Sequence, residues 1–382
     1  MHDEIYMLWL SSLVPWLGTR KLNLLLARFG TARNIFTAHP THAKTLGNLT
    51  DNALNHLLKN RDLDFIENLL GIMESQQMAF LSRNHERFPT LLGAIPDPPV
   101  GVFYIGELPA DATNKVAIIG SRKCSDYGLQ AARLLAMPLA KNNIVIVSGL
   151  ARGVDSMAHK GAVDVGGKTI AVLGCGADIC YPAENRQLRD KIIENGCVLS
   201  EYPPGTKPIG AFFPARNRII SGLCRAIIVA EAGKKSGTLI TVDQATEQGR
   251  DVLAVPGNIM NPLSAGTNLL IREGAIPVTD YTDVLFALGL SIKTDTSQLT
   301  NQYAHGSSVS NETKSKAQED TINSLAPDEK LVYDSLTFES VSFDNIVMKT
   351  NLPSMNLHFF LTTLELKDLI TKHPGARYAR KN

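Results

Sequence analysis

The sequence predicts an α/β protein whose central part forms a doubly wound, largely parallel sheet, with a helical domain before it and a small mixed domain after it. Between residues 75 and 290, short runs rich in Val and Ile alternate with segments long enough for helices. Such apolar runs are typical of strands buried on both faces of a parallel sheet. Before this part leucines recur at helical spacing, and after it the chain becomes strongly polar before a last apolar segment.

The bulk composition is that of an ordinary globular chain with material for two or three domains. Of 382 residues, 44% are hydrophobic and 20% are charged, and the formal net charge is +1. Because the net charge is close to zero, any binding of nucleic acid must come from local clusters of Lys and Arg. The acidic start at Asp3 and Glu4 does not fit a secretory signal, and no apolar stretch is long enough to span a bilayer. We therefore expect a soluble, cytoplasmic protein without a membrane partner.

The five cysteines predict neither a metal site nor a disulfide framework. Their number is odd, and their spacing does not match that of metal ligands. In a chain of this length we interpret them as reduced and mostly buried thiols.

Residues 1–74 predict an all-helical domain of the helix-hairpin-helix or SAM-like kind. Leu22, Leu25 and Leu26 recur on one helical face, and Gly18 places a tight turn within residues 15–21. Such a hairpin can offer backbone N–H groups at a helix N-terminus to a phosphate. The alternative is a packing module, which we favour because a single hairpin is a weak motif.

Residues 75–290 predict the sheet. Helix-length segments at 127–141, 184–194 and 238–248 lie between the apolar runs. The predicted strands are 116–119, 144–147, 169–173, 198–199, 226–230 and 252–255. A further strand at 100–105, which follows a Pro-rich turn, is expected to add to one edge of the sheet.

The end of the chain predicts a linker followed by a winged-helix domain. Residues 291–322 are dominated by Ser, Thr, Asn, Gln and Lys, as in a solvated linker, whereas residues 323–382 carry three helical segments and a small hairpin. The third helix, at 355–366, has little positive charge, although duplex-reading helices project Arg, Lys, Asn or Gln toward base edges. Basic residues gather at the end of the chain instead: Lys372, Arg377, Arg380 and Lys381. We interpret this domain as an accessory contact to DNA or to a partner, with a structural role nearly as well supported.

The loops after the predicted strands form the candidate binding site, because ligands of an open parallel sheet bind outside the carboxyl ends of its strands. Small or basic residues follow the first two of these strands: Gly120, Ser121, Arg122 and Lys123, then Ser148, Gly149 and Arg152. Glycines and small hydroxyl residues expose backbone amides that can hold an anion, and arginine adds a fixed positive fork. Asp155 is expected to cap the helix that follows.

Basic and aromatic residues follow two more strands. Those after strand 198–199 are Lys207, Phe213, Arg216, Asn217 and Arg218, the last three at the expected start of a helix. Positive charge for phosphates beside flat faces for bases suits a single nucleic-acid strand. After strand 226–230, the amides of Ser236, Gly237 and Thr238 are expected at a helix N-terminus, which favours phosphate. With the glycine-bearing loop 174–178, five such loops share one edge, so an anionic ligand is favoured over a purely structural role.

The motifs predict no cofactor and no catalytic set. The dinucleotide pattern Gly-x-Gly-x-x-Gly is absent after strand 116–119, and residues 233–238 lack the lysine and the spacing of a Walker A loop. We therefore expect neither a nicotinamide cofactor nor NTPase activity. His159 is expected to pack or to be solvated, Glu231 to orient an arginine or backbone groups, and Ser148 has no identifiable His partner.

Together these motifs resemble those of the DNA-processing protein A (DprA, Smf) family. The matching segments follow the family's order over most of residues 95–280: 116–122, 148–155, 213–220, 236–241, 254–258 and 266–268. The resemblance implies an extended Rossmann-like fold, a homodimer, binding of single-stranded DNA without catalysis, and loading of the RecA recombinase in natural transformation. It also implies Arg122 as the chief DNA contact, with Lys207 and the Phe-Pro-x-Arg-Asn-Arg segment in the same groove. Single-strand-binding protein is a candidate further partner.

Two other functions compete with this interpretation. A related Rossmann variant occurs in nucleoside-monophosphate phosphoribohydrolases, but Thr241 stands where their signature has a carboxylate, so hydrolysis would lack its main electrostatic support. The other alternative is an interaction scaffold whose loops only dimerise; an apolar strand edge or helix late in the sheet domain is the expected dimer contact. The DNA interpretation requires that four basic residues share one rim and are not buried in ion pairs: Arg122, Lys207, Arg216 and Arg218.

Overall fold

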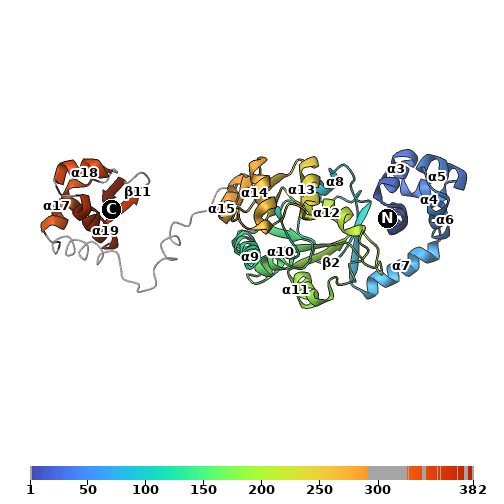
Figure 1. Ribbon diagram of the computed structural model, residues 1–382. Helices are drawn as coiled ribbons and strands as arrows, with labels where there is room; N and C mark the ends of the chain where they lie inside the picture. Colours follow the sequence, from blue (N-terminus) through green and yellow to red (C-terminus); the bar gives the residue numbers. More distant parts are fainter. Residues whose placement is uncertain are drawn as a thin grey trace. The chain divides into compact units, whose positions relative to one another are not determined.

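The computed structural model divides the chain into two compact units, Met1–Ile292 and Lys293–Asn382 (Figure 1). It describes residues 2–290, 325, 327–337, 341–350, 352, 354–367, 369–373 and 377–380. The predicted linker at 291–322 lies outside these described residues. Each unit is considered by itself below.

Seven helices open the first unit. They are α1 (His2–Ser12), α2 (Val14–Leu17), α3 (Thr19–Phe29), α4 (Ala32–Thr37), α5 (Pro40–Gly47), α6 (Asp51–Lys59) and α7 (Leu63–Ser75). Gly18, with φ of +75°, makes the predicted tight turn between α2 and α3, since other residues rarely adopt this conformation. Buried Trp9 and Leu10 share one hydrophobic core with Phe103 of the sheet. The helices therefore pack on the sheet within one unit, and the boundary at residue 74 stays a prediction.

A nine-stranded sheet forms the centre of the first unit, and the predicted doubly wound α/β fold is confirmed. Its strands are β1 (Met78–Ser82), β2 (Gly101–Gly106), β3 (Lys115–Ile119), β4 (Val145–Ser148), β5 (Thr169–Leu173), β6 (Gly196–Ser200), β7 (Ala226–Val229), β8 (Asp251–Ala254) and β9 (Ile276–Pro277). Their order is β1-β2-β6-β5-β4-β3-β7-β8-β9, parallel from β6 to β9. Strand β2 is the predicted extra strand and pairs antiparallel with β6. It is not the edge strand, because β1 pairs with its other side.

Helices cover both faces of this sheet (Figure 1). They are α8 (Thr90–Gly93), α9 (Asp126–Lys141), α10 (Val154–Val163), α11 (Arg186–Asn195), α12 (Phe212–Gly222), α13 (Thr238–Glu247), α14 (Ala265–Arg272) and α15 (Tyr281–Ala287). One core joins Leu139 of α9 to Val154 of α10 and Leu285 of α15. A second core, on alternate strand residues, joins Ile219 of α12 to Leu270 of α14. The parallel strands are thus buried on both sides, which is why their sequences are almost uniformly apolar.

The second unit has the winged-helix arrangement that the sequence predicts. Helices α17 (Pro327–Ser335), α18 (Phe343–Thr350) and α19 (Ser354–Leu366) pack with strands β10 (Val341–Ser342), β11 (Ile370–His373) and β12 (Arg377–Arg380). The three strands form an antiparallel sheet in the order β10-β12-β11. Val332, Leu361 and Tyr378 lie in its core.

The cysteines are described in the first unit. All five cysteines are free, and Cys175, Cys197 and Cys224 are buried. Burial raises the pKa of the Cys175 thiol to about 12, so this thiol is protonated at neutral pH. Within the described parts of the chain, no helix is both long and apolar enough to cross a bilayer. The same parts hold no cluster of His, Cys, Asp and Glu suited to a metal ion.

Candidate nucleic-acid interface

A pocket of about 680 Å³ lies at the carboxyl edge of the parallel strands, where the sequence places the binding site. It brings together loops that are far apart in the chain, after β3, around the start of α12 and at the start of α13. Ten of the predicted site residues line it: Gly120, Ser121, Arg122, Lys123, Phe213, Arg216, Asn217, Ser236, Gly237 and Thr238. The predicted residues are therefore half of the twenty that line this pocket.

Arg122 and an aromatic pair form one wall of the pocket. The Arg122 guanidinium is exposed, and its Cζ lies 5.5 Å from the centroid of the Phe213 ring. Tyr181 lies on the other side, 5.4 Å from Phe213 between ring centroids, and is 44% exposed. A free guanidinium can pair with a phosphate, while aromatic faces offer stacking surface to bases. Tyr181 was missed in the sequence, where it follows loop 174–178; its aromatic type beside a strand end was the available signal.

The start of α13 forms another part of the pocket wall. Gly237 precedes the helix, and Ser236, Gly237 and Thr238 all line the pocket. The Ser236 hydroxyl lies 2.9 Å from the Thr238 hydroxyl and accepts a hydrogen bond from the Thr238 amide at 3.2 Å. The positive end of the helix dipole therefore faces the same space as Arg122, which favours a phosphate there. Lys234 and Lys235, just before this turn, are exposed.

Arg216 is a structural part of the pocket floor, and its predicted role as a free DNA contact is corrected. Its side chain is buried, and Nη1 donates hydrogen bonds to the carbonyl groups of Gly149, at 2.8 Å, and of Val172. A Cβ at Gly149 would lie 2.5 Å from this Nη1, so the glycine is required for the close approach. Burial lowers the pKa of Arg216 to about 10, which leaves it charged at neutral pH. Its Cζ lies 5.9 Å from the Phe213 centroid, so it supports this ring from below the surface.

Arg218 is also not a free contact. Its side chain is 12% exposed and donates from Nη2 to both carboxylate oxygens of Glu201 at 2.6 Å. The same group donates to Thr19 at the start of α3, whose hydroxyl donates to Glu201 at 2.7 Å. This buried network joins the N-terminal hairpin to the sheet, which supports the packing role over phosphate binding for that hairpin.

Helix geometry explains both corrections. The sequence predicts a helix start at Arg216, but α12 begins at Phe212. Residues 216–218 therefore lie inside the helix, where successive side chains are about 100° apart. Arg216 points into the floor, Asn217 lines the pocket, and Arg218 lies toward Glu201. The expectation that four basic residues share one rim thus fails for Arg216 and Arg218.

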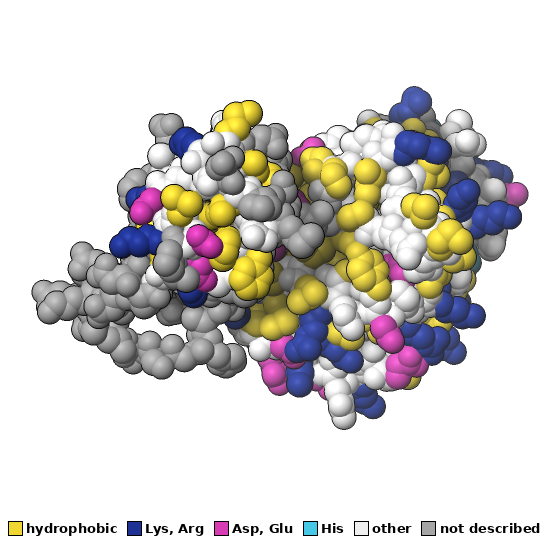
Figure 2. Space-filling model, turned by 60° about the vertical axis from the view of Figure 1, so that its left-hand side comes forward, with side chains coloured by type: hydrophobic (Ala, Val, Ile, Leu, Met, Phe, Trp, Pro, Cys, Tyr) yellow, Lys and Arg dark blue, Asp and Glu magenta, His cyan; other side chains and the backbone are white. Residues whose placement is uncertain are grey.

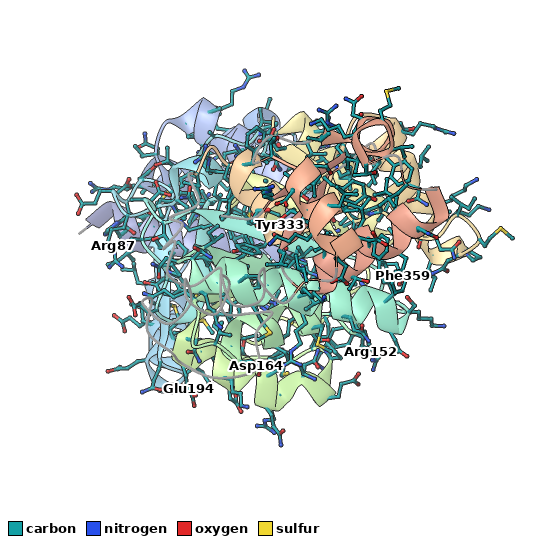
Figure 3. All side chains as sticks on the ribbon, turned by 90° about the vertical axis from the view of Figure 1, so that its left-hand side faces the viewer. Arg87, Arg152, Asp164, Glu194, Tyr333 and Phe359 are labelled. Atoms are coloured by element: carbon teal, nitrogen blue, oxygen red, sulfur yellow. The ribbon has the colours of Figure 1, made fainter. Side chains whose placement is uncertain are left out.

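Residues after β4 support the pocket more than they line it. Ser148 is buried and donates to the Ile118 carbonyl at 2.7 Å, so a direct contact from Ser148 is corrected to a structural role. Asp155 does not cap α10, where Gly153 is the N-cap residue; its carboxylate accepts the Gly149 amide instead, at 3.1 Å. Arg152 is exposed and pairs with Glu184 at 2.5 Å outside the pocket (Figure 3). Such exposed pairs exchange readily, so Arg152 stays a candidate peripheral contact.

Lys207 is exposed beside the pocket. Its neighbour Pro208 lines the pocket, but the Lys207 side chain does not. On the face shown in Figure 2, Lys and Arg side chains lie in separate groups with hydrophobic side chains between them. This pattern fits a net charge near zero and a local basic site.

Two buried titratable groups, Glu231 and His159, form hydrogen bonds within the sheet domain. Glu231 is buried, and its carboxylate accepts hydrogen bonds from the amide and the hydroxyl of Ser125, at 2.7 and 2.6 Å. His159 is buried with Nδ1 2.7 Å from the hydroxyl of Thr169, which itself donates to the Ile146 carbonyl. His159 Nδ1 must therefore carry the proton. Glu231 thus orients backbone groups and His159 packs in the interior, as the sequence predicts.

Acidification is expected to destabilise the protein through His159. Burial lowers the pKa of this imidazole from 6.5 to about 3. Below pH 6.5 the unfolded chain therefore binds a proton that the folded chain does not, so stability falls as the pH falls toward 3. Between pH 7 and 5 the free energy of unfolding should drop by about 2 kcal/mol from this group. Urea unfolding at several pH values measures the slope, and a His159→Gln variant with an unchanged slope would rule out this origin.

The winged helix offers an apolar surface on its third helix. Phe359 of α19 is largely exposed (Figure 3). Met348 of α18 is largely exposed as well. Two basic side chains of this domain form ion pairs, Lys367 with Glu329 and Arg380 with Asp334. The side chains of Lys372 and Lys381 lie outside the described residues. These contacts favour a partner-binding or structural role over reading of a duplex.

Comparisons with known proteins agree with the observed fold. The family model for DNA recombination-mediator protein A matches residues 79–289, and the model for the DprA winged-helix domain matches residues 316–376. The chain is similar to Protein Smf of Synechocystis, with 33% identity over 98% of both chains. It is 49% identical to DNA processing protein DprA of Streptococcus pneumoniae over 217 residues, 54% of this chain and 77% of that one.

Two solved structures are similar to the first unit. The structure of DNA processing protein A from Streptococcus pneumoniae has a TM-score of 0.64 at 38% identity, covering 74% of this chain and 97% of that chain. The structure of the Helicobacter pylori protein, studied for its single-stranded DNA binding mode, has a TM-score of 0.50 at 34% identity, with 56% and 95% covered.

Proposed function

Because the chain belongs to the DNA recombination-mediator protein A family, we propose that its pocket binds single-stranded DNA without covalent chemistry. One observation carries the proposal: exposed Arg122 lies over Phe213 and lines a single pocket together with the N-terminus of α13. A nucleic-acid backbone could place a phosphate between these two positive groups while a base stacks on Phe213 or Tyr181. The Helicobacter pylori relative, named for its single-stranded DNA binding mode, supports the same ligand.

A single strand suits the site better than a duplex. The stacking faces of Tyr181 and Phe213 need bases that are not already stacked in a helix. The contacts to phosphate are electrostatic, so the affinity should fall as salt concentration rises. Ten predicted residues act in this proposal as wall or floor of the DNA site, while Lys207 and Arg152 act as peripheral contacts.

We further propose that the chain protects incoming single-stranded DNA and loads the RecA recombinase onto it. The family's name as a recombination mediator supports this step. A strand-exchange assay with recombinase and single-strand-binding protein tests the loading role. Single-strand-binding protein imposes a lag on strand exchange, and a loader should shorten this lag. If the lag is the same with and without the chain, the loading role fails while DNA binding remains measurable.

A hydrolytic role on nucleoside monophosphates has less support. Thr241 lines the pocket and is buried where a phosphoribohydrolase would need a carboxylate. Glu231 is engaged by Ser125 and cannot replace it without losing both hydrogen bonds. Release of free base from nucleoside monophosphates would contradict the non-enzymatic proposal.

A homodimer through the β9 edge is part of the proposal. Strand β9 ends the sheet order and pairs with β8 alone, and its Ile276 is exposed. Phe286 on the nearby α15 is 86% exposed. Unpaired strand edges with apolar side chains are ready templates for another chain.

The double variant Ile276→Lys with Phe286→Asp is therefore expected to be monomeric where the parent is dimeric. Light scattering after size-exclusion chromatography measures the mass of each. Leu134→Asp on α9, which also places a charge at an exposed apolar residue, is the control and should leave the mass unchanged. A dimer that survives the double variant would move the interface elsewhere.

A further inference from the structure

The loop after β8 exposes two large apolar side chains that have no role in the pocket. Ile259 is 88% exposed and Met260 is 83% exposed. Single exposed apolar residues are common on protein surfaces, but two neighbours at the end of one loop are a candidate contact surface. The pair is called the apolar tip below.

The loop that carries the apolar tip is held rigidly. At its base the Asn268 side chain accepts from the Gly257 amide at 3.1 Å and donates to the Gly257 carbonyl at 2.9 Å. Asn258 accepts from the Met260 amide at 2.9 Å, which closes a tight turn around Ile259. The Tyr127 hydroxyl donates to the Pro256 carbonyl at 2.6 Å. A loop fixed by four side-chain hydrogen bonds presents Ile259 and Met260 in a preorganised position.

The same loop is tied to the edge of the DNA pocket. The Asn261 amide group donates to Glu231 at 3.5 Å, and Glu231 accepts the two hydrogen bonds of Ser125. Ser125 is two residues after Lys123, which lines the pocket. The loop that carries the apolar tip is therefore linked, through Asn261, Glu231 and Ser125, to the loop that carries Arg122.

We propose that the apolar tip inserts against the bases of single-stranded DNA where the strand leaves the pocket, and separates two neighbouring bases. This inference rests on the proposed function and adds a second contact to it. Ile and Met are side chains that proteins insert between base steps, because they replace base stacking with apolar contact. Two side chains alone bury too little surface for a stable protein interface, so a base step fits the tip better than a protein partner.

The test compares the parent with the variant Ile259→Ser/Met260→Ser on oligodeoxyadenylates that carry one 2-aminopurine at successive positions, where this base is stacked between adenines. The emission of this base rises when it is unstacked. With the parent, emission should rise at one step outside the pocket; the serine variant should lose this rise and bind long strands about tenfold more weakly. Strands of about 4 nucleotides, which occupy the pocket only, should bind equally well to both.

Matched variants separate the proposal from its alternatives. Ile259→Leu/Met260→Leu keeps the apolar surface and should keep both the emission change and the affinity. Leu134→Ser removes exposed apolar surface from the middle of α9 and should change neither. Equal thermal unfolding of all variants confirms that they fold.

Three outcomes would overturn the apolar tip as a base wedge. One is a serine variant that matches the parent at every strand length and every labelled position. Another is normal DNA binding with loss of recombinase loading, which would make the tip a protein contact. The third is a serine variant that is monomeric where the parent is dimeric. If the parent itself does not bind single strands, the proposed function fails instead, and Arg122→Ala will have nothing to weaken.

Discussion

Replacement of Arg122 by alanine should weaken binding of a long oligothymidylate by about 1 to 3 kcal/mol, which is roughly 5- to 150-fold in the dissociation constant. Arg122 is the one arginine of the pocket wall that remains exposed, since Arg216 is buried in the floor. Its removal takes away the guanidinium that lies over Phe213 and, in the proposed complex, a charge-assisted contact to phosphate. The slope of log affinity against log salt should also become smaller by about one phosphate contact.

The control for Arg122 lies at the opposite edge of the same sheet. Arg225 precedes β7, is exposed, and donates to Asn114 at 3.1 Å. Arg225→Ala changes the net charge by the same amount, so it should reproduce any non-specific electrostatic loss and nothing more. Fluorescence anisotropy at several salt concentrations measures both variants. Equal affinities of the two variants would mean that the DNA site is not this pocket.

The location of the site could be predicted because it depends on topology. Parallel strands end at one edge of a sheet, so Gly120, Phe213 and Gly237 had to come together even though they are far apart in the chain. The apolar runs predicted the strands for the same reason, since burial on both faces requires them. Strand β9 was not predicted, because it has only two residues, both exposed and one of them a proline, and so contains no apolar run.

The roles of the individual arginines could not be predicted from their positions in the sequence. Arg122 and Arg216 are the same residue type, each near a strand end, yet one is exposed and the other is buried. The difference comes from where α12 begins, and helix starts are poorly defined when no capping residue marks them; Ala211 at the N-cap makes no side-chain hydrogen bond. A shift of four residues moves Arg216 from the open end of a helix into its body.

The buried position of Arg216 leads to the largest expected effect on stability. In an Arg216→Met variant, the carbonyl groups of Gly149 and Val172 lose their donor. Burial raises the pKa of Asp155, and the variant also removes the positive charge of Arg216 that opposes this rise. Breaking one side of a buried charged network typically costs about 3 to 5 kcal/mol. The free energy of unfolding measured in urea should therefore fall by about this amount, whereas Lys207→Met should leave it nearly unchanged because Lys207 is exposed.

A double-mutant cycle shows whether the cost comes from the uncompensated charge. If Asp155 is a buried carboxylate that depends on Arg216, then Asp155→Asn combined with Arg216→Met should be less destabilising than the sum of the two single changes. Additive losses would instead assign the cost of Arg216→Met to the two carbonyl groups. In either case the variant should also bind DNA more weakly, because Arg216 supports the Phe213 ring from the pocket floor. An Arg216→Met protein of parental stability that fails only in DNA binding would restore Arg216 as a direct contact, against its burial in this structure.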